Sequence, residues 1–276
     1  MCEARCGLSS QEDGVLRELF EPTPDPAALD PNEAARQASR PRLIKRFYKE
    51  AAVAPVEGGF AVTLDGKPIR TPSKRHVVVP TRPLAEVIAS EWAAQSESLD
   101  PVTMPLTRLA NSVCEGVVDC VEAVRDDLAR YFQSDLLFYR AGHPEALVAR
   151  EAAQWDPVLF WAARQLGAHF ILAEGLTHVP QPEAAVTAAR AALPEDPWSI
   201  AALHVITTLT GSALLALALF HRHLDAAAVW AAAHVDEDWN VAQWGADELM
   251  MQRRAARFTD FSAAVVVLEM VNPPRS

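Results

Sequence analysis

A short acidic run followed by two tryptophans is the most informative feature of this chain. Asp236, Glu237 and Asp238 come directly before Trp239, and Trp244 follows five residues after Trp239. Carboxylates are favoured at the start of a helix because the backbone dipole is positive there. Tryptophan is large and amphipathic, and it is enriched at the centres of protein interfaces. The run therefore indicates either recognition of a partner protein or two core indoles that cover a helix end.

The sequence lacks the glycine motifs that bind phosphate or expose a nucleophile. Gly59 and the pair Gly66-Lys67 do not have the spacing of a phosphate-binding loop, and Pro68 stands where such a loop needs a hydroxyl group for magnesium. Neither G-x-G-x-x-G nor G-x-S-x-G occurs. No nucleophile has a base beside it. We therefore predict no catalytic residue and no cofactor.

Metal-ligating residue types are present without the spacing of a metal site. His221, His223 and Asp225 supply three potential ligands without a fourth, which is typical of solvated histidines at a helix end. The cysteines are Cys2, Cys6, Cys114 and Cys120. None of them forms a C-x-x-C pair, so we predict no metal site and reduced thiols.

Length, composition and charge restrict the classes of partner. The chain has 276 residues, 50% of them hydrophobic, which is enough for one large domain or two modest ones. Its formal net charge is −11. A nucleic-acid binder normally shows a basic face, and anionic lipid attracts basic segments. The composition therefore argues against both of these partners.

The sequence shows no targeting or membrane-spanning segment. The N-terminus has no hydrophobic signal-peptide core, and its acidic residues argue against a mitochondrial presequence. The longest apolar run, Ile200 to Phe220, contains His204 and three threonines, so a buried core helix is favoured over a membrane span. We predict a cytoplasmic bacterial protein that does not insert into membranes.

The periodicity of the chain predicts an α+β fold in two parts after a tail. Residues 1–40 are acidic, alanine-rich and broken by prolines, and we expect a disordered tail there. Residues 41–104 are expected to form a small antiparallel sheet with a helix, and residues 105–276 a larger all-helical domain.

Local signals predict the elements of both parts. Asp65-Gly66 follows the alternating run Phe60–Leu64, which indicates a hairpin turn. Further strands are expected at Phe47–Val53 and His76–Val79, and Thr81 with Pro83 predicts the start of a helix. After several earlier helices, the C-terminal part is predicted to contain helices over 183–193, 198–222, 225–234, 237–257 and 259–270.

A basic cluster surrounds the predicted hairpin. Lys67, Arg70, Lys74 and Arg75 lie within nine residues of one another. Basic side chains protect an exposed strand edge from unwanted pairing, so the cluster is explained by an ordinary soluble edge. The alternative is that it contacts an acidic rim on a partner protein.

Several motifs together resemble one protein family. They are Arg46-Phe47-Tyr48-Lys49, Leu64 to Pro72, Glu91-Trp92, Met104 to Asn111, Ser134 to Leu137, Trp155-Asp156-Pro157, Leu209 to Ser212 and the segment from Asp236 to Gly245. Their order and spacing resemble the assembly chaperone of the F-type ATP synthase head that holds the alpha subunit. The resemblance covers about Arg42 to Leu268.

The resemblance implies a non-catalytic chaperone with an α+β N-terminal domain and a helical C-terminal domain. Its client would be the newly made alpha subunit, whose apolar interface is exposed until a beta subunit covers it. The family's acidic position near the W-G step falls on Asp236 or Glu237, and we favour Glu237. The expected partner-binding residues are Glu237, Asp236, Trp239, Trp244 and Arg70, in a protein expected to be a monomer.

Two other classes of function stay open on the sequence. An enzyme with an inter-domain cleft would use Asp135, Asp236 and Glu237 as acid and base, and a deep pocket around these carboxylates would support it. A passive structural subunit of a complex would copurify at fixed stoichiometry.

Overall fold

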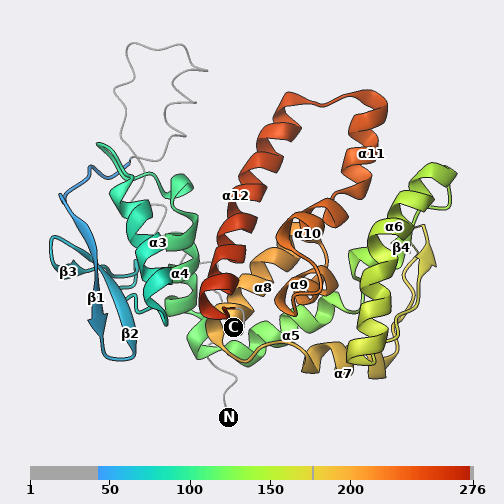
Figure 1. Ribbon diagram of the computed structural model, residues 1–276, viewed down its shortest axis with the longest axis horizontal. Coiled ribbons are helices and arrows are strands. Elements are labelled where there is room, and N and C mark those ends of the chain that lie inside the picture. The colour runs from blue at the N-terminus through green and yellow to red at the C-terminus, as the bar shows by residue number, and fades with distance from the viewer. Residues whose placement is uncertain (1–42, 176, 274–276) are drawn as a thin grey trace, which may run out of the picture.

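The computed structural model describes residues 43–175 and 177–273, and its elements are shown in Figure 1. The predicted tail at residues 1–40 lies outside the described residues. A small antiparallel sheet is followed by a mostly helical part, so the predicted fold class is confirmed.

The sheet contains three strands in the order β1-β2-β3. They are β1 (Ala51–Val56), β2 (Gly59–Leu64) and β3 (Lys67–Pro68). The turn between β2 and β3 is the predicted one, because Asp65 and Gly66 both have positive φ, 47° and 81°. The Asp65 carboxylate also accepts the backbone N–H groups of Lys49 and Glu50, at 3.1 and 2.9 Å. The turn therefore holds the start of the sheet as well as the hairpin.

Two predicted strands differ from the structure. The predicted strand Phe47–Val53 begins only at Ala51. The predicted strand His76–Val79 makes isolated bridges, Arg70 with His76 and Phe60 with Val79, without a continuous ladder. Pro68 has no N–H to continue the pairing of β3, which explains the short ladder. Val77 and Val79 are nevertheless each 1% exposed, so this segment belongs to the core.

Helix α3 (Arg82–Ala93) covers the sheet. Thr81 Oγ1 accepts the N–H of Leu84 and Pro83 lies in the first turn, as the sequence predicts. Leu84 and Ile88 are fully buried and lie four residues apart, so they share one face of the helix. That face packs on β1 and β2.

Nine longer helices form the rest of the molecule. They are α4 (Pro105–Glu115), α5 (Val121–Tyr131), α6 (Glu145–Trp161), α7 (Glu183–Ala191), α8 (Pro197–Thr210), α9 (Ala213–Phe220), α10 (Ala226–Ala233), α11 (Val235–Trp244) and α12 (Glu248–Val271), as assigned within the described ranges. Short 3-10 turns lie at Pro101–Thr103, Val117–Asp119 and Leu136–Phe138. Two short strands, β4 (Tyr139–Arg140) and β5 (Ala173–Glu174), pair in parallel, which adds a small strand element to the part predicted as all-helical.

Three helix boundaries differ from those that periodicity predicts, and two of them lie at glycines. The predicted helix 198–222 is two helices, because Gly211 ends α8 with φ 73° and Ser212 caps α9. The predicted helix 237–257 ends at Trp244, before Gly245. The predicted helix 259–270 belongs to one helix, α12, which begins after its cap Asp247.

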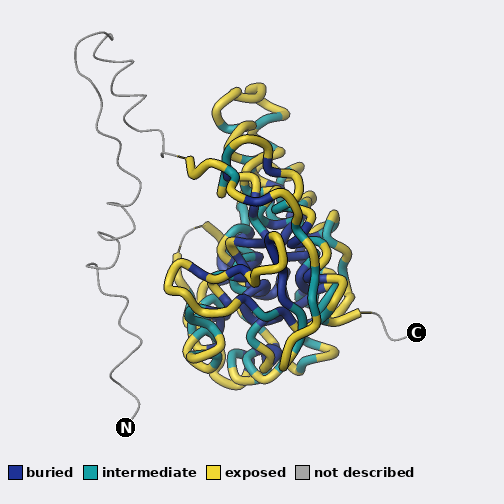
Figure 2. Tube along the Cα trace, turned by 90° about the vertical axis from the view of Figure 1, so that its left-hand side faces the viewer, coloured by how far each residue is buried: buried dark blue, intermediate teal, exposed yellow. Residues whose placement is uncertain are grey.

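Helices α8, α9 and α12 build the centre of the core. Ile200, Leu203, Leu214 and Leu217 are each fully buried, and α12 packs along α8. Figure 2 shows the buried trace gathered in the middle and an exposed region at the top, where α11 joins α12. In the described part of the chain, no helix is both long and apolar enough to cross a membrane.

We expect deletion of residues 1–40 to change the melting temperature by less than about 2 °C, because the segment is broken by prolines and lacks a core-facing stripe. Thermal melting followed by circular dichroism measures it. Deletion of residues 1–48 is the matched control and should lower the melting temperature clearly. It removes Tyr48, which is 5% exposed and donates its hydroxyl to Trp92 O at 2.7 Å. A large decrease from the shorter deletion would show that Leu16, Leu19 and Phe20 dock on the fold.

Candidate partner-binding surface

The acidic run lies in the first turn of α11, as the sequence predicts. His234 precedes the helix without a capping hydrogen bond from its side chain, and Asp236, Glu237 and Asp238 follow. Their charges meet the positive end of the helix dipole. Their side chains contact the neighbouring helices α6 and α12. The run therefore fixes the position of α11 and also stabilises its first turn.

Glu237 and Asp238 face α12. Arg257 Nη1 donates to Glu237 Oε1 at 3.1 Å, and Arg254 forms an ion pair with Asp238. Arg257 Nη2 also donates to Leu209 O at the end of α8, at 2.6 Å. Arg257 therefore joins three helices at one point, and Glu237 supplies the carboxylate that balances its charge.

A buried histidine lies beneath this ion pair. His234 is 1% exposed, its Nδ1 lies 2.7 Å from Trp230 O, and its Nε2 lies 3.8 Å from Glu237 Oε2. Burial lowers the pKa of His234, and the charges of Arg254 and Arg257 lower it further. The imidazole is therefore neutral near pH 7, so the contact with Glu237 is not an ion pair.

Asp236 and Trp239 face α6 instead. Glu151 on α6 is 2% exposed, and its carboxylate accepts the N–H of Ala141 at 2.9 Å. Burial and the nearby charge of Asp236 raise the pKa of Glu151. The Arg150 guanidinium lies over the Trp239 ring at 5.1 Å, a cation–π contact. Trp239 is half-buried.

The end of α11 and the start of α12 form an exposed arm. We define the arm as residues 235–258, which project at the top of the molecule in Figure 1. Trp244 is 79% exposed, Leu249 53%, Phe258 48% and Met251 45%. Neither Trp239 nor Trp244 is a core residue, so the interpretation as two core indoles is wrong. Large apolar side chains gathered on one projection are typical of a binding surface.

Arg70 does not lie with the other predicted site residues. It follows β3, which Figure 1 places at the opposite end of the molecule from α11. Its guanidinium donates to Lys74 O at 2.9 Å, and the neighbouring Arg75 forms an ion pair with Asp119 at 2.6 Å. The structure thus brings together Asp236, Glu237 and Trp239, while Trp244 lies further along the same helix.

Asp135, proposed as an acid or base in the enzyme hypothesis, is fully buried. Its Oδ1 accepts the N–H of Leu137 at 3.1 Å, and its Oδ2 accepts the N–H of Leu214 at 3.0 Å. It therefore caps a 3-10 turn and the start of α9 with one side chain. Burial raises the pKa of Asp135 to about 6. A side chain with no exposed surface cannot touch a substrate, so Asp135 has a structural role.

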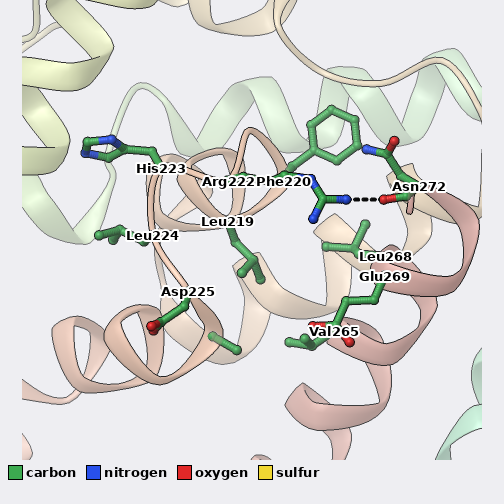
Figure 3. Close-up of a pocket in the computed structure, with 11 residues that line it drawn as sticks. Leu219, Phe220, Arg222, His223, Leu224, Asp225, Val265, Leu268, Glu269 and Asn272 are labelled. Atoms are coloured by element: carbon green, nitrogen blue, oxygen red, sulfur yellow. Dashed lines mark hydrogen bonds between the residues drawn. The ribbon is translucent and has the colours of Figure 1, made fainter. Parts of the chain in front are cut away.

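The histidines near the end of α9 also have structural roles. The His223 ring stacks on Trp161 with centroids 5.3 Å apart, and the Asp225 carboxylate caps α10 through Ala228 N–H at 2.8 Å. The adjoining cavity has a volume of about 260 Å³. In Figure 3, Arg222 donates to Asn272 O at its edge, and His223 and Asp225 point in different directions. Within the described ranges, no group of three or more ligating residues could hold a metal ion.

Comparisons with known proteins agree on one family. The ATP12 chaperone protein family matches residues 45–163. The Atu1473 protein of Agrobacterium tumefaciens, a candidate chaperone of known crystal structure, is 49% identical to this chain. The match covers 89% of this chain and 93% of the Atu1473 chain, with a TM-score of 0.81. The crystal structure of Atp12 from Paracoccus denitrificans is 39% identical, covers 83% of this chain and 99% of its own, and has a TM-score of 0.77. This protein belongs to the ATP12 chaperone family.

Proposed function

We propose that this protein is an assembly chaperone of the F-type ATP synthase, which binds the newly made alpha subunit and covers its apolar interface until the beta subunit replaces it. Membership of the ATP12 chaperone family supports the chaperone activity. The alpha subunit as client follows from the motif resemblance described above. We further propose that the protein acts as a monomer in the bacterial cytoplasm, without a cofactor.

The exposed arm is the observation that carries the proposal. Trp244, Leu249 and Met251 place an apolar surface on a projection, where it can reach an apolar interface of the client. Asp236 and Glu237 add carboxylates at the base of that surface. A contact made by one projecting, mostly apolar surface is suited to reversible binding. Reversible binding is required if the beta subunit is to replace the chaperone on the alpha subunit.

Catalysis is not needed for this function, and the contacts of these carboxylates do not bring them together as an acid and a base. Glu237 is engaged by Arg257, Asp236 lies near Glu151, and Asp135 is buried between two helix starts. An enzyme would need at least one of them facing a substrate pocket together with the others. The separation of Asp135 from the surface argues against that arrangement.

We expect the purified protein to suppress aggregation of refolding alpha subunit at equimolar ratio, without ATP. Light scattering during dilution of denatured alpha subunit measures the effect. The double variant Trp244→Ser with Leu249→Ser should lose most of the protection, because it removes two exposed apolar side chains from the arm. Val102→Ser is the matched control, since Val102 is 72% exposed and lies outside the arm. Unchanged scattering with the wild-type protein would contradict the proposed client.

A further inference from the structure

A second apolar surface lies beside the C-terminal half of α6. A groove of about 510 Å³ is lined by Leu159, Phe160, Ala163, Phe170 and Leu172 together with Asp156, Arg164 and His169. We name it the Phe160 groove. Phe160 is 64% exposed and Leu172 is 45% exposed. Phe160 and Leu172 belong neither to the buried core nor to the arm, so their exposure needs a separate explanation.

Backbone geometry, ring stacking and side-chain hydrogen bonds fix both walls of the groove. A π-helical turn, Ala162–Leu166, ends α6, and Gly167 with φ 70° sends the chain back along the helix. Phe170 stacks on Phe138 with centroids 4.7 Å apart, which anchors the returning wall to the core. Gln181 accepts the N–H of Ile171 at 2.8 Å and donates to its carbonyl at 2.9 Å. The apolar side chains are therefore presented on a preformed surface.

The charge of the groove differs from that of the whole chain, whose net charge is −11. The Asp156 carboxylate is neutralised by Arg140 Nη2 at 2.8 Å. Arg164 is exposed and, among the described residues, has neither an ion-pair nor a hydrogen-bond partner. A bound carboxylate would supply Arg164 with that partner. The groove is thus complementary to an apolar segment that carries an acidic residue.

Helix α6 connects this groove to the arm. Arg150 and Glu151, in its first half, lie against Trp239 and Asp236 of α11. Phe160 lies nine residues after Glu151, about 14 Å further along the helix axis. Nine residues turn a helix through about 900°, so Phe160 lies on the side of α6 away from Glu151, and a client that contacts both surfaces has to extend around α6.

We infer that the Phe160 groove is a second contact surface for the client, and that it takes an apolar segment of the alpha subunit bearing a carboxylate. The inference rests on the proposed function. Two separated contacts raise the overall affinity through effective concentration, while each stays weak enough for the beta subunit to displace in turn. The groove thus supplies affinity, and its single arginine selects the segment.

The first test removes the apolar walls. The double variant Phe160→Ser with Leu172→Ser should weaken binding to isolated alpha subunit about tenfold, measured as Kd by biolayer interferometry. Val102→Ser, at an exposed apolar position away from the groove, should stay within about twofold of wild type. Circular dichroism confirms that the variants are folded. A folded double variant with wild-type affinity overturns the inference and leaves the proposed function intact.

The second test reverses the charge. Arg164→Glu should weaken binding about fivefold or more, and the loss should shrink at high salt, because the contact is an exposed ion pair. Lys45→Glu is the control, since it makes the same change in net charge at an exposed basic residue outside the groove. Equal effects from the two variants would overturn the role of Arg164.

The third test locates the client segment. A photoreactive amino acid in place of Phe160 should cross-link to alpha subunit, and mass spectrometry should find Asp or Glu within about four residues of the attachment point, the reach of one helical turn. Attachment to a segment without acidic residues overturns the charge complementarity. If the wild-type protein fails to bind alpha subunit, the proposed function is wrong. If the wild-type protein binds but the groove variants bind equally well, only the inference about the groove is wrong.

Discussion

Asp135→Ala is expected to lower the free energy of unfolding by about 3 kcal/mol at pH 5, because two buried N–H groups lose their acceptor. These are the N–H groups of Leu137 and Leu214, at the starts of a 3-10 turn and of α9. Urea unfolding followed by circular dichroism measures the change. Asp127→Ala is a control on a more exposed aspartate, which is paired with Arg130 and His204, and should cost about 1 kcal/mol or less.

The destabilisation by Asp135→Ala should be smaller at pH 7.5 than at pH 5. The folded-state pKa of Asp135 is raised to about 6 from 3.8, so between these values the native protein binds more protons than the unfolded chain. The contribution of Asp135 therefore falls as pH rises through that window, by about 1 kcal/mol between pH 5 and pH 7.5. A destabilisation that grew with pH would contradict the buried, protonated carboxyl group at pH 5.

Glu237→Lys is expected to weaken binding of the alpha subunit about thirtyfold, close to 2 kcal/mol, while the fold survives. The new ammonium group would face Arg257 and Arg254, so the arm should also be destabilised by about 1 kcal/mol. Thermal melting and the affinity for alpha subunit, measured on the same preparation, separate the two effects. A folded variant that binds normally would remove Glu237 from the site and leave Asp236 and the Trp239–Trp244 surface as candidates.

A charge exchange distinguishes a direct contact from a positioning role. The double variant Glu237→Arg with Arg257→Glu restores an ion pair between α11 and α12 with the signs reversed. If Glu237 positions the arm, binding should recover with the ion pair. If its carboxylate meets a basic group on the client, binding should stay weak although the melting temperature recovers.

Features that depend on neighbouring residues could be predicted from the sequence. The Asp65-Gly66 turn needs two residues that accept positive φ, and the start of α3 needs a cap and an early proline, so both signals are local. The ends of α8 and α11 also had local signals in Gly211 and Gly245. Apolar periodicity continues past both glycines, so periodicity alone predicts helices that run through them.

The candidate site could be predicted only in part, because only some of its contacts lie within one helix. Asp236, Glu237 and Trp239 fall on one short helix, so their proximity follows from spacing alone. Their partners do not, because Arg150 and Arg257 reach them only through the packing of α6 and α12. Trp244 was predicted with them, but its 79% exposure depends on where the helix ends relative to the core.

The last helix of the chain completes the packing of the first part. Thr81, which caps α3, donates its hydroxyl to Met270 O at the end of α12 at 3.1 Å, and α12 packs on α3, α4 and α8. Because Met270 lies 189 residues after Thr81, a nascent chain carries an N-terminal unit with an uncovered face until α12 has been made. The start of α12 also belongs to the arm. One helix therefore both covers the N-terminal unit and supplies part of the proposed client surface, so this unit is covered only after the arm has been made.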